Sequence, residues 1–172
     1  NKVNTVETFV ANSSGSTLFL TGQTEGFTIS GGAGVDNLTG GNADDIITGG
    51  AGHDTLVGGT GNDTFNVDSG TDIITLLGGD NSGAGGDSDV LVVSSGATVN
   101  AANINSFTAT TASSNAGTAN LSTKAAGGTI NMAASNSGAY NINGGAGADI
   151  LTGGSGNDVF TVAATTEADG DT

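Results

Sequence analysis

Aspartates recur at nine-residue steps in two parts of the chain, and this pattern could bind cations. Each unit opens with a glycine pair and holds aspartate at its sixth place: Asp36, Asp45, Asp54, Asp63, Asp149 and Asp158. Asp72 keeps the sixth place in the next unit, although Val67 and Asp68 replace its glycines. The eighth place is apolar in every full unit: Leu38, Ile47, Leu56, Phe65, Leu151 and Phe160. Such spacing puts short carboxylate arms at fixed backbone positions.

The nine-residue step suits Ca²⁺ in particular. Nine residues divide into a six-residue turn, in which glycines take φ > 0, and a three-residue strand. Two units then complete one coil, and the turns of successive coils stack at the parallel-strand spacing of about 4.8 Å. Because Ca²⁺–oxygen bonds are about 2.4 Å, an ion midway between two stacked turns contacts both. Mg²⁺ requires shorter bonds, and zinc prefers His or Cys ligands.

The elements that position these aspartates are short parallel strands, so the predicted fold is all-β, a right-handed parallel β-roll or β-solenoid. Steps of nine from Leu38 reach Ile29 and Leu20 in one direction and Ile74 in the other. Phe27 and Tyr140 stand where aspartate is expected in the unit that leads into each block. Residues 26–41 and 139–154 agree at ten of sixteen positions, which indicates a duplicated arrangement.

The chain divides by composition into five segments. We expect lead-in strands without aspartate ligands over 1–30, a first repeat block over 31–75, and a loop insertion with a strand over 76–93, the loop itself spanning 77–89. A spacer rich in Ala, Ser, Thr and Asn covers 94–143, and a second block with the start of another spacer covers 144–172. Alternating apolar residues favour strands in the spacer. A disordered linker is the alternative interpretation.

Charge and composition exclude several function classes. The 172 residues carry 17 acidic and 2 basic side chains, for a net charge of −15, which argues against nucleic acid and anionic membranes as partners. No apolar run is long enough to span a membrane, and the chain contains no cysteine. His53 is the only histidine and occupies a variable place in a turn, while Asp44 is an exposed neighbour of Asp45. We therefore predict that the chain is not an enzyme.

The units resemble the RTX (hemolysin-type) nonapeptide, Gly-Gly-x-Gly-x-Asp-x-apolar-x, a calcium-binding repeat of parallel β-helices. The resemblance implies that each turn binds one ion through carbonyls of its first and third positions, and the next ion through its second and fourth. Its aspartate binds either ion or both. The carbonyl ligands so implied are Gly31, Ala33, Gly40, Asn42, Gly49, Gly50, Ala51, Gly52, Gly58, Gly59, Thr60, Gly61, Gly144, Ala146, Gly153 and Ser155.

The same resemblance implies which turns share ions. The turns that begin at 31 and 49 share one, those at 40 and 58 share another, and Asp72 completes a third with the turn at 49. The two turns of the second block lie on opposite sides, so each needs a partner from flanking residues, for which Glu167 is a candidate. About three to five Ca²⁺ are expected in total. Ala43 departs from the pattern at a fourth-position glycine, which bears on that carbonyl.

Three functions are compatible with such a chain. The first is a calcium-stabilised structural module of a secreted bacterial cell-surface protein (an S-layer, a filament or an adhesin) that folds and assembles on binding Ca²⁺. The second is the RTX export and folding domain of a type I-secreted enzyme or toxin. The third is a ligand- or ice-binding adhesin module. Expected partners are copies of the chain, further repeats of a longer chain or cell-surface polysaccharide, and the expected location is extracellular.

Overall fold

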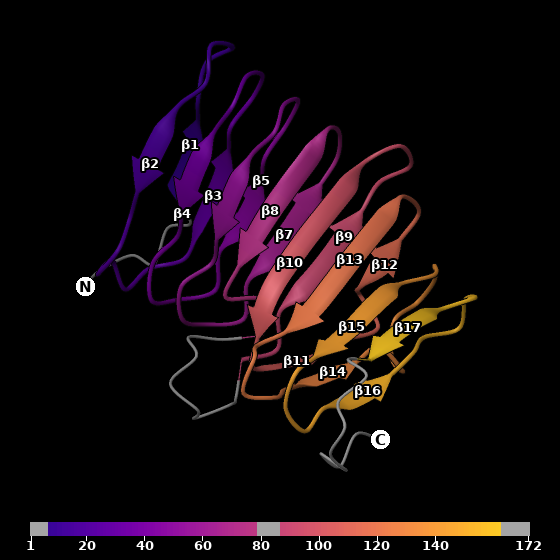
Figure 1. The fold of residues 1–172 in the computed structure, drawn as a ribbon. Helices are drawn as coiled ribbons and strands as arrows, with labels where there is room; N and C mark the ends of the chain where they lie inside the picture. Colours follow the sequence, from indigo (N-terminus) through magenta and orange to yellow (C-terminus); the bar gives the residue numbers. More distant parts are fainter. Residues whose placement is uncertain (1–6, 79–86, 163–172) are drawn as a thin grey trace.

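Parallel strands, wound into a solenoid of about seven turns, make up the chain in the computed structural model, which describes residues 7–78 and 87–162 (Figure 1). One sheet has the order β1-β3-β5-β7-β9-β12, the second has the order β17-β15-β13-β10-β8-β6-β4-β2, and a short third sheet has the order β11-β14-β16. Within the described residues there is no helix, and so none that could cross a membrane. The expected all-β solenoid is confirmed.

The strands are short and each contributes to one sheet only. The first sheet contains β1 (Glu7–Val10), β3 (Phe27–Ser30), β5 (Ile46–Thr48), β7 (Thr64–Val67), β9 (Val90–Val93) and β12 (Ser114–Asn115). The second contains β2 (Thr17–Phe19), β4 (Asn37–Thr39), β6 (Thr55–Val57), β8 (Thr71–Thr75), β10 (Thr98–Ile104), β13 (Thr118–Thr123), β15 (Asn141–Gly145) and β17 (Val159–Val162). The third contains β11 (Ser106–Thr108), β14 (Thr129–Asn131) and β16 (Ile150–Thr152).

The apolar residue of each strand points inward and stacks on its counterpart in the next coil. In the second sheet this column runs Leu18, Leu38, Leu56, Ile74, Ala101, Leu121, Ile142 and Phe160. Pairing Leu18 with Leu38 corrects the expectation for Leu20, because the first coil has 20 residues rather than 18 and the step of nine fails there. The core is thus narrow: β4, β5 and β6 bury one side chain each, whereas β3 and β7 bury two.

The spacer consists of strands, as the alternation of apolar residues suggested. Coils here are longer, since Thr98 pairs with Thr118 and Ile130 with Leu151. Asn120 donates to Asn100 at 2.8 Å on the outer face, and Asn141 donates to Asn120 at the same distance. These amide contacts join three successive coils by side chains that carry no charge. The spacer is therefore an aspartate-free part of the solenoid and not a linker.

The expected insertion lies between β8 and β9. Phe65 pairs with Leu91 across 26 residues, eight more than the 18 that separate Ile47 from Phe65. Residues 79–86 of the expected loop are outside the described residues. On either side of it the chain keeps the register of the solenoid.

The inward and outward faces of the strands can be tested by mutation. Leu56 is fully buried in the middle of its column, so Leu56→Ala should reduce the free energy of unfolding by about 3 kcal/mol, measured by denaturant titration in calcium buffer. Ile46→Ala is the control, because Ile46 points outward from β5 and is exposed. Equal losses in the two variants would contradict the assignment of inward and outward faces.

Candidate metal centre

The sixth-place aspartates stack in two columns, because alternate turns connect the sheets on opposite edges of the solenoid (Figure 1). The first column contains Asp36, Asp54 and Asp72, and the second contains Asp45, Asp63 and Asp89. All six side chains are buried. Stacked, buried carboxylates repel one another and lose hydration, which is unfavourable unless they are paired or neutralised.

In every column aspartate except Asp36, at least one carboxylate oxygen has a structural role. Asp54 Oδ1 accepts the backbone N–H of Asp36 at 2.9 Å, and Asp72 Oδ1 accepts that of Asp54 at 3.0 Å. The second column repeats this contact from Asp63 to the N–H of Asp45 and from Asp89 to the N–H of Asp63, both at 2.9 Å. Each of these aspartates therefore accepts a hydrogen bond from a backbone amide of the preceding coil. A longer glutamate arm would not keep this spacing.

The other oxygen is available to a cation in the first column. Asp54 Oδ2, Asp72 Oδ2 and both oxygens of Asp36 are buried and have no hydrogen-bond partner. Asp54 Oδ2 and Asp72 Oδ2 converge beside Gly49, where an added Cβ would lie 2.5 Å from the first and 3.1 Å from the second. Two carboxylate oxygens from successive turns thus face one small space that only glycine leaves open.

Backbone carbonyls complete the same arrangement. A Cβ on Gly31 would meet both the Gly49 carbonyl of the next coil and Asp36 Oδ2, and a Cβ on Gly40 would meet the Gly58 carbonyl and Asp45 Oδ2. Among the described residues, no three Asp, Glu, His or Cys side chains converge as a group. A site here would therefore combine a carboxylate from each of two turns with carbonyls, a hard all-oxygen donor set that fits Ca²⁺.

The third-position carbonyls already serve the stacking of turns. The Ala51 carbonyl accepts the N–H of Gly34 at 2.7 Å, and the Ala33 carbonyl accepts that of Gly15 at 3.2 Å. A carbonyl oxygen has two lone pairs, so this contact leaves one for a cation. The carbonyl ligands implied by the resemblance stay predictions; those of Gly49 and Gly58 face the same spaces as Asp36 Oδ2 and Asp45 Oδ2.

Asp45, the first aspartate of the second column, is hydrogen-bonded differently from Asp36, the first aspartate of the first column, and the sequence did not predict this difference. Asp45 Oδ1 accepts the N–H of Phe27 at 2.7 Å and Asp45 Oδ2 accepts that of Gly41 at 2.6 Å, so both oxygens are paired. Ala43 does not have a positive φ, unlike Gly34 and Gly52 at the same place in neighbouring turns. The turn at 40–45 therefore accommodates a Cβ at Ala43 and holds its own carboxylate by backbone donors.

Asp89 is the site residue that sequence analysis missed. It occupies the sixth place of the coil after Asp63, displaced by the insertion, and its Oδ2 accepts the N–H of Gly78 at 2.7 Å. The spacing Asp89-Val90-Leu91 repeats the aspartate-x-apolar signature and was the available signal. The eight-residue insertion shifts Asp89 out of the nine-residue step, so the step does not predict it.

In the second block, each of the two aspartates contacts a preceding coil that has no acidic residue. Asp149 Oδ1 accepts the N–H of Gly128 and Asp158 Oδ1 accepts that of Tyr140, both at 2.8 Å. The two turns lie on opposite edges, as expected from their spacing. Glu167, the candidate partner, is outside the described residues.

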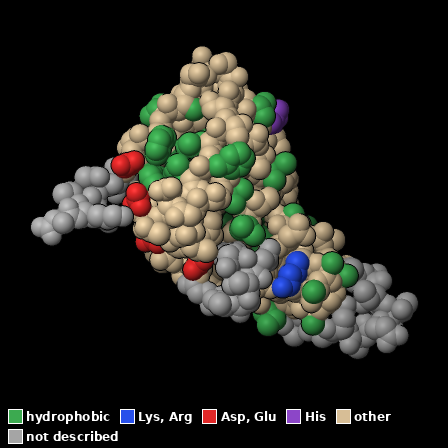
Figure 2. All heavy atoms as spheres, turned by 90° about the vertical axis from the view of Figure 1, so that its left-hand side faces the viewer, with side chains coloured by type: hydrophobic (Ala, Val, Ile, Leu, Met, Phe, Trp, Pro, Cys, Tyr) green, Lys and Arg blue, Asp and Glu red, His purple; other side chains and the backbone are tan. Residues whose placement is uncertain are grey.

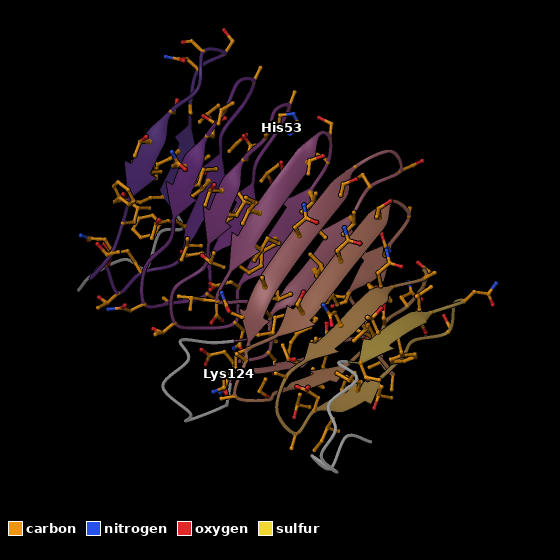
Figure 3. The ribbon with its side chains drawn as sticks, viewed as in Figure 1. His53 and Lys124 are labelled. Atoms are coloured by element: carbon orange, nitrogen blue, oxygen red, sulfur yellow. The ribbon has the colours of Figure 1, made fainter. Side chains whose placement is uncertain are left out.

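Outer side chains of the turns have structural contacts. Asp44 Oδ1 accepts the N–H of Asn62 at 2.7 Å, and Asn62 Oδ1 accepts that of Ser88 at the same distance. His53 Nδ1 lies 3.1 Å from the Thr71 carbonyl at one edge of the solenoid, far from Lys124 (Figure 3). These residues brace adjacent coils beside the aspartate columns.

Burial also changes the acidity of the columns. Burial, together with the charges of Asp89, Asp45 and Asp44, raises the pKa of Asp63 to about 8, although the hydrogen bond from the N–H of Asp45 acts to lower it. Burial raises the pKa of Asp72 and of Asp89 to about 6 each. The pKa values of Asp45 and Asp54 are raised too, again chiefly by burial. Without a cation, the folded chain therefore binds protons here.

Removing one carboxylate from the first column tests its affinity for Ca²⁺. Asp54→Asn keeps the size of the side chain and its contact with the N–H of Asp36, but it removes one of two converging charges. We expect the calcium midpoint of folding to rise about tenfold, since affinity follows ligand charge. Glu7→Gln, which removes one charge from an exposed side chain of β1 outside the columns, is the control. Equal shifts would show that total charge and not the column sets affinity.

The raised pKa values predict how pH acts on the metal-free chain. A carboxyl whose pKa is higher in the folded than in the unfolded state stabilises the fold below its unfolded pKa, and this contribution is lost as pH rises through the folded value. Because the pKa of Asp63 is 3.8 in the unfolded chain and about 8 in the folded chain, strand content in chelator should rise as pH falls from 8 to 4. Circular dichroism measures this, and Asp63→Asn should flatten the dependence. An unchanged slope in that variant would assign the effect to surface charge.

A family model supports the metal assignment. The RTX calcium-binding nonapeptide repeat (4 copies) matches residues 28–56, 48–83 and 136–163, which include both blocks. No curated protein matches the chain, and no solved structure does. With the repeats in register and the aspartates stacked, residues 28–83 and 136–163 are RTX calcium-binding nonapeptide repeats.

Proposed function

We propose that this chain is a calcium-stabilised structural module of a secreted bacterial cell-surface protein, such as an S-layer, a filament or an adhesin, and that it folds and assembles on binding Ca²⁺. The observation that carries the proposal is the convergence of Asp54 Oδ2 and Asp72 Oδ2, buried and unpaired, beside Gly49. Such a pair makes the folded state depend on a cation.

The remaining surface favours a structural role. The outward row of the second sheet runs Thr17, Asn37, Thr55, Ile73, Asn100, Asn120, Asn141 and Val159. This mixed row interrupts the regular threonine array that an ice-binding face would need. The one histidine of the chain bonds to a backbone carbonyl, which gives it a bracing contact. The solenoid is an elongated stack of parallel strands with neutral amide side chains on its outer face.

The calcium affinity that is usual for extracellular modules supports the proposed location. Extracellular calcium modules bind at about 10⁻⁴–10⁻³ M, well above cytosolic levels, so the chain would stay unfolded before export and fold outside. RTX repeats are typical of secreted bacterial proteins. The alternative, an export and folding domain of a type I-secreted enzyme or toxin, uses the same switch. A catalytic signature elsewhere in the full-length protein would favour this alternative.

Folding of the chain should therefore require calcium at neutral pH. We expect circular dichroism to show a largely disordered chain in chelator and a strand spectrum in 5 to 10 millimolar Ca²⁺ (about tenfold above the usual extracellular affinity). The reason is that the stacked carboxylates repel and the core is narrow, with one or two buried side chains on each of β3 to β7. Mg²⁺ at the same concentration is the control and should restore less structure. A strand spectrum in chelator would contradict the proposal.

A further inference from the structure

Asn143 directly precedes Gly144 at the start of the second block, and we propose that this pair is a site of spontaneous chemical modification in the folded chain. Asn143 loses its side-chain amide as ammonia, and the position becomes a mixture of aspartate and isoaspartate. Asn143 is the only asparagine of the chain that a glycine follows. The inference goes beyond the proposed function, because the reaction needs only the folded chain and water.

The reaction passes through a cyclic imide, with water as its only co-reactant. The backbone nitrogen of Gly144 attacks Cγ of Asn143, so that a new N–Cγ bond closes a five-membered succinimide ring and the Cγ–Nδ2 bond breaks. The leaving Nδ2 takes the proton of the Gly144 N–H and departs as ammonia. Water then opens the ring. Cleavage of the N–Cγ bond gives aspartate, and cleavage of the bond to the backbone carbonyl carbon gives isoaspartate, in which the chain runs through Cγ.

The side chain of Asn143 is exposed and oriented for this attack. It points outward from β15, so water reaches it. Its Oδ1 accepts the N–H of Gly145 at 2.9 Å, which turns the side-chain amide back toward the peptide that joins Asn143 to Gly144. The same hydrogen bond stabilises the negative charge that Oδ1 gains when Cγ is attacked. Within residues 7–78 and 87–162, none accepts a hydrogen bond from the leaving Nδ2.

Gly144 supplies a nitrogen that the strand ladder does not fix. Strand β13 pairs with β15 as far as Asn143, and β17 pairs with Asn143 and then with Gly145. Gly144 is therefore the extra residue of a bulge, and neither neighbouring strand pairs with it. Its carbonyl accepts the hydroxyl of Thr123, a contact that does not involve the attacking nitrogen. Glycine also has no Cβ to hinder the approach of this nitrogen to Cγ.

Three other asparagines have the same side-chain contact and serve as comparisons. The Oδ1 atoms of Asn12, Asn115 and Asn131 each accept the backbone N–H two residues later at 3.0 Å. They are followed by serine, alanine and methionine. Asn115 is also buried and donates its Nδ2 to the Ala139 carbonyl. The orienting contact is thus shared, and only at Asn143 does an unhindered nitrogen follow it.

Conversion at Asn143 changes the turn that follows. Gly144 lies close to Asp149, since a Cβ on Gly144 would be 3.0 Å from Asp149 Oδ2. Isoaspartate lengthens the backbone by one methylene before Gly144 and so displaces it from that carboxylate. Either product also adds a negative charge to residues 90–148, which contain no acidic side chain. In Figure 2, the visible acidic side chains lie on one side of the molecule and the basic one on the other. The effect on calcium rests on the proposed function: a displaced turn binds Ca²⁺ less tightly.

Peptide mass mapping of the natural chain, folded in Ca²⁺ and incubated at neutral pH, tests the site. We expect Asn143 to convert at least about tenfold faster than Asn12 and Asn131 in the same sample, because only Gly144 lacks a Cβ beside the attacking nitrogen. Asn143→Gln keeps an amide but cannot close the five-membered ring, so it should stay unmodified. Equal rates at the three asparagines, or conversion of Asn143 in chelator but not in Ca²⁺, would overturn the proposal.

The products test the ring mechanism. An isoaspartyl methyltransferase labels isoaspartate and not aspartate, so it should label the incubated natural chain and leave Asn143→Gln unlabelled. Aspartate formed without isoaspartate would contradict the cyclic intermediate.

A calcium titration followed by circular dichroism tests the consequence separately. The incubated natural chain should need more Ca²⁺ to fold than the fresh chain, with Asn143→Gln incubated in parallel as the control. A converted chain with an unchanged midpoint overturns the effect on the turn and leaves the modification site standing. A chain that never folds with Ca²⁺ overturns the proposed function, whereas equal conversion rates in a calcium-folded chain overturn only the site.

Discussion

The structure depends on burying aspartates on top of one another. Every stacked carboxylate except that of Asp36 accepts a hydrogen bond from an amide of the coil before it, and Asp54 and Asp72 direct the other oxygen into the same small space. The first contact positions the coils, and the second makes their approach unfavourable without a positive charge. A narrow core, with one or two buried side chains on each of β3 to β7, cannot offset that repulsion. Cation binding and coil stacking are therefore one event in this chain.

The same constraint explains where the coils vary in length. Within the columns the step is 18 residues from Asp36 to Asp54 to Asp72 and from Asp45 to Asp63, so that the turns stack on one another. The step from Asp63 to Asp89 is 26, because eight residues are inserted between β8 and β9 without changing how the turns stack. Where no aspartates face each other the step changes to 20 from Leu18 to Leu38 and to 27 from Ile74 to Ala101. Only strand pairing has to be kept there, so the connecting turns are free to lengthen.

Much of this could be predicted, and the failures have physical causes. The nine-residue pattern predicts the sheets, the inward residues and the stacking of Asp36 on Asp54, because each is fixed by coil length alone. It missed Asp89, since eight inserted residues shift the numbering but not the register. It also treated the two columns alike. The pairing of both Asp45 oxygens depends on the backbone shape at Gly41, which no spacing specifies.

Neutral coils at the ends of the columns limit how far the repulsion spreads. Phe27 donates its N–H to Asp45 and so begins the second column with an aromatic ring, as Tyr140 does for Asp158. The first column ends where Asp72 pairs with Val99, a buried apolar residue. In a one-dimensional stack, each coil is stabilised only by its neighbours. Uncharged coils on both sides therefore end the columns without adding to the repulsion that the cations must offset, and they fold together with the calcium-binding coils that they contact.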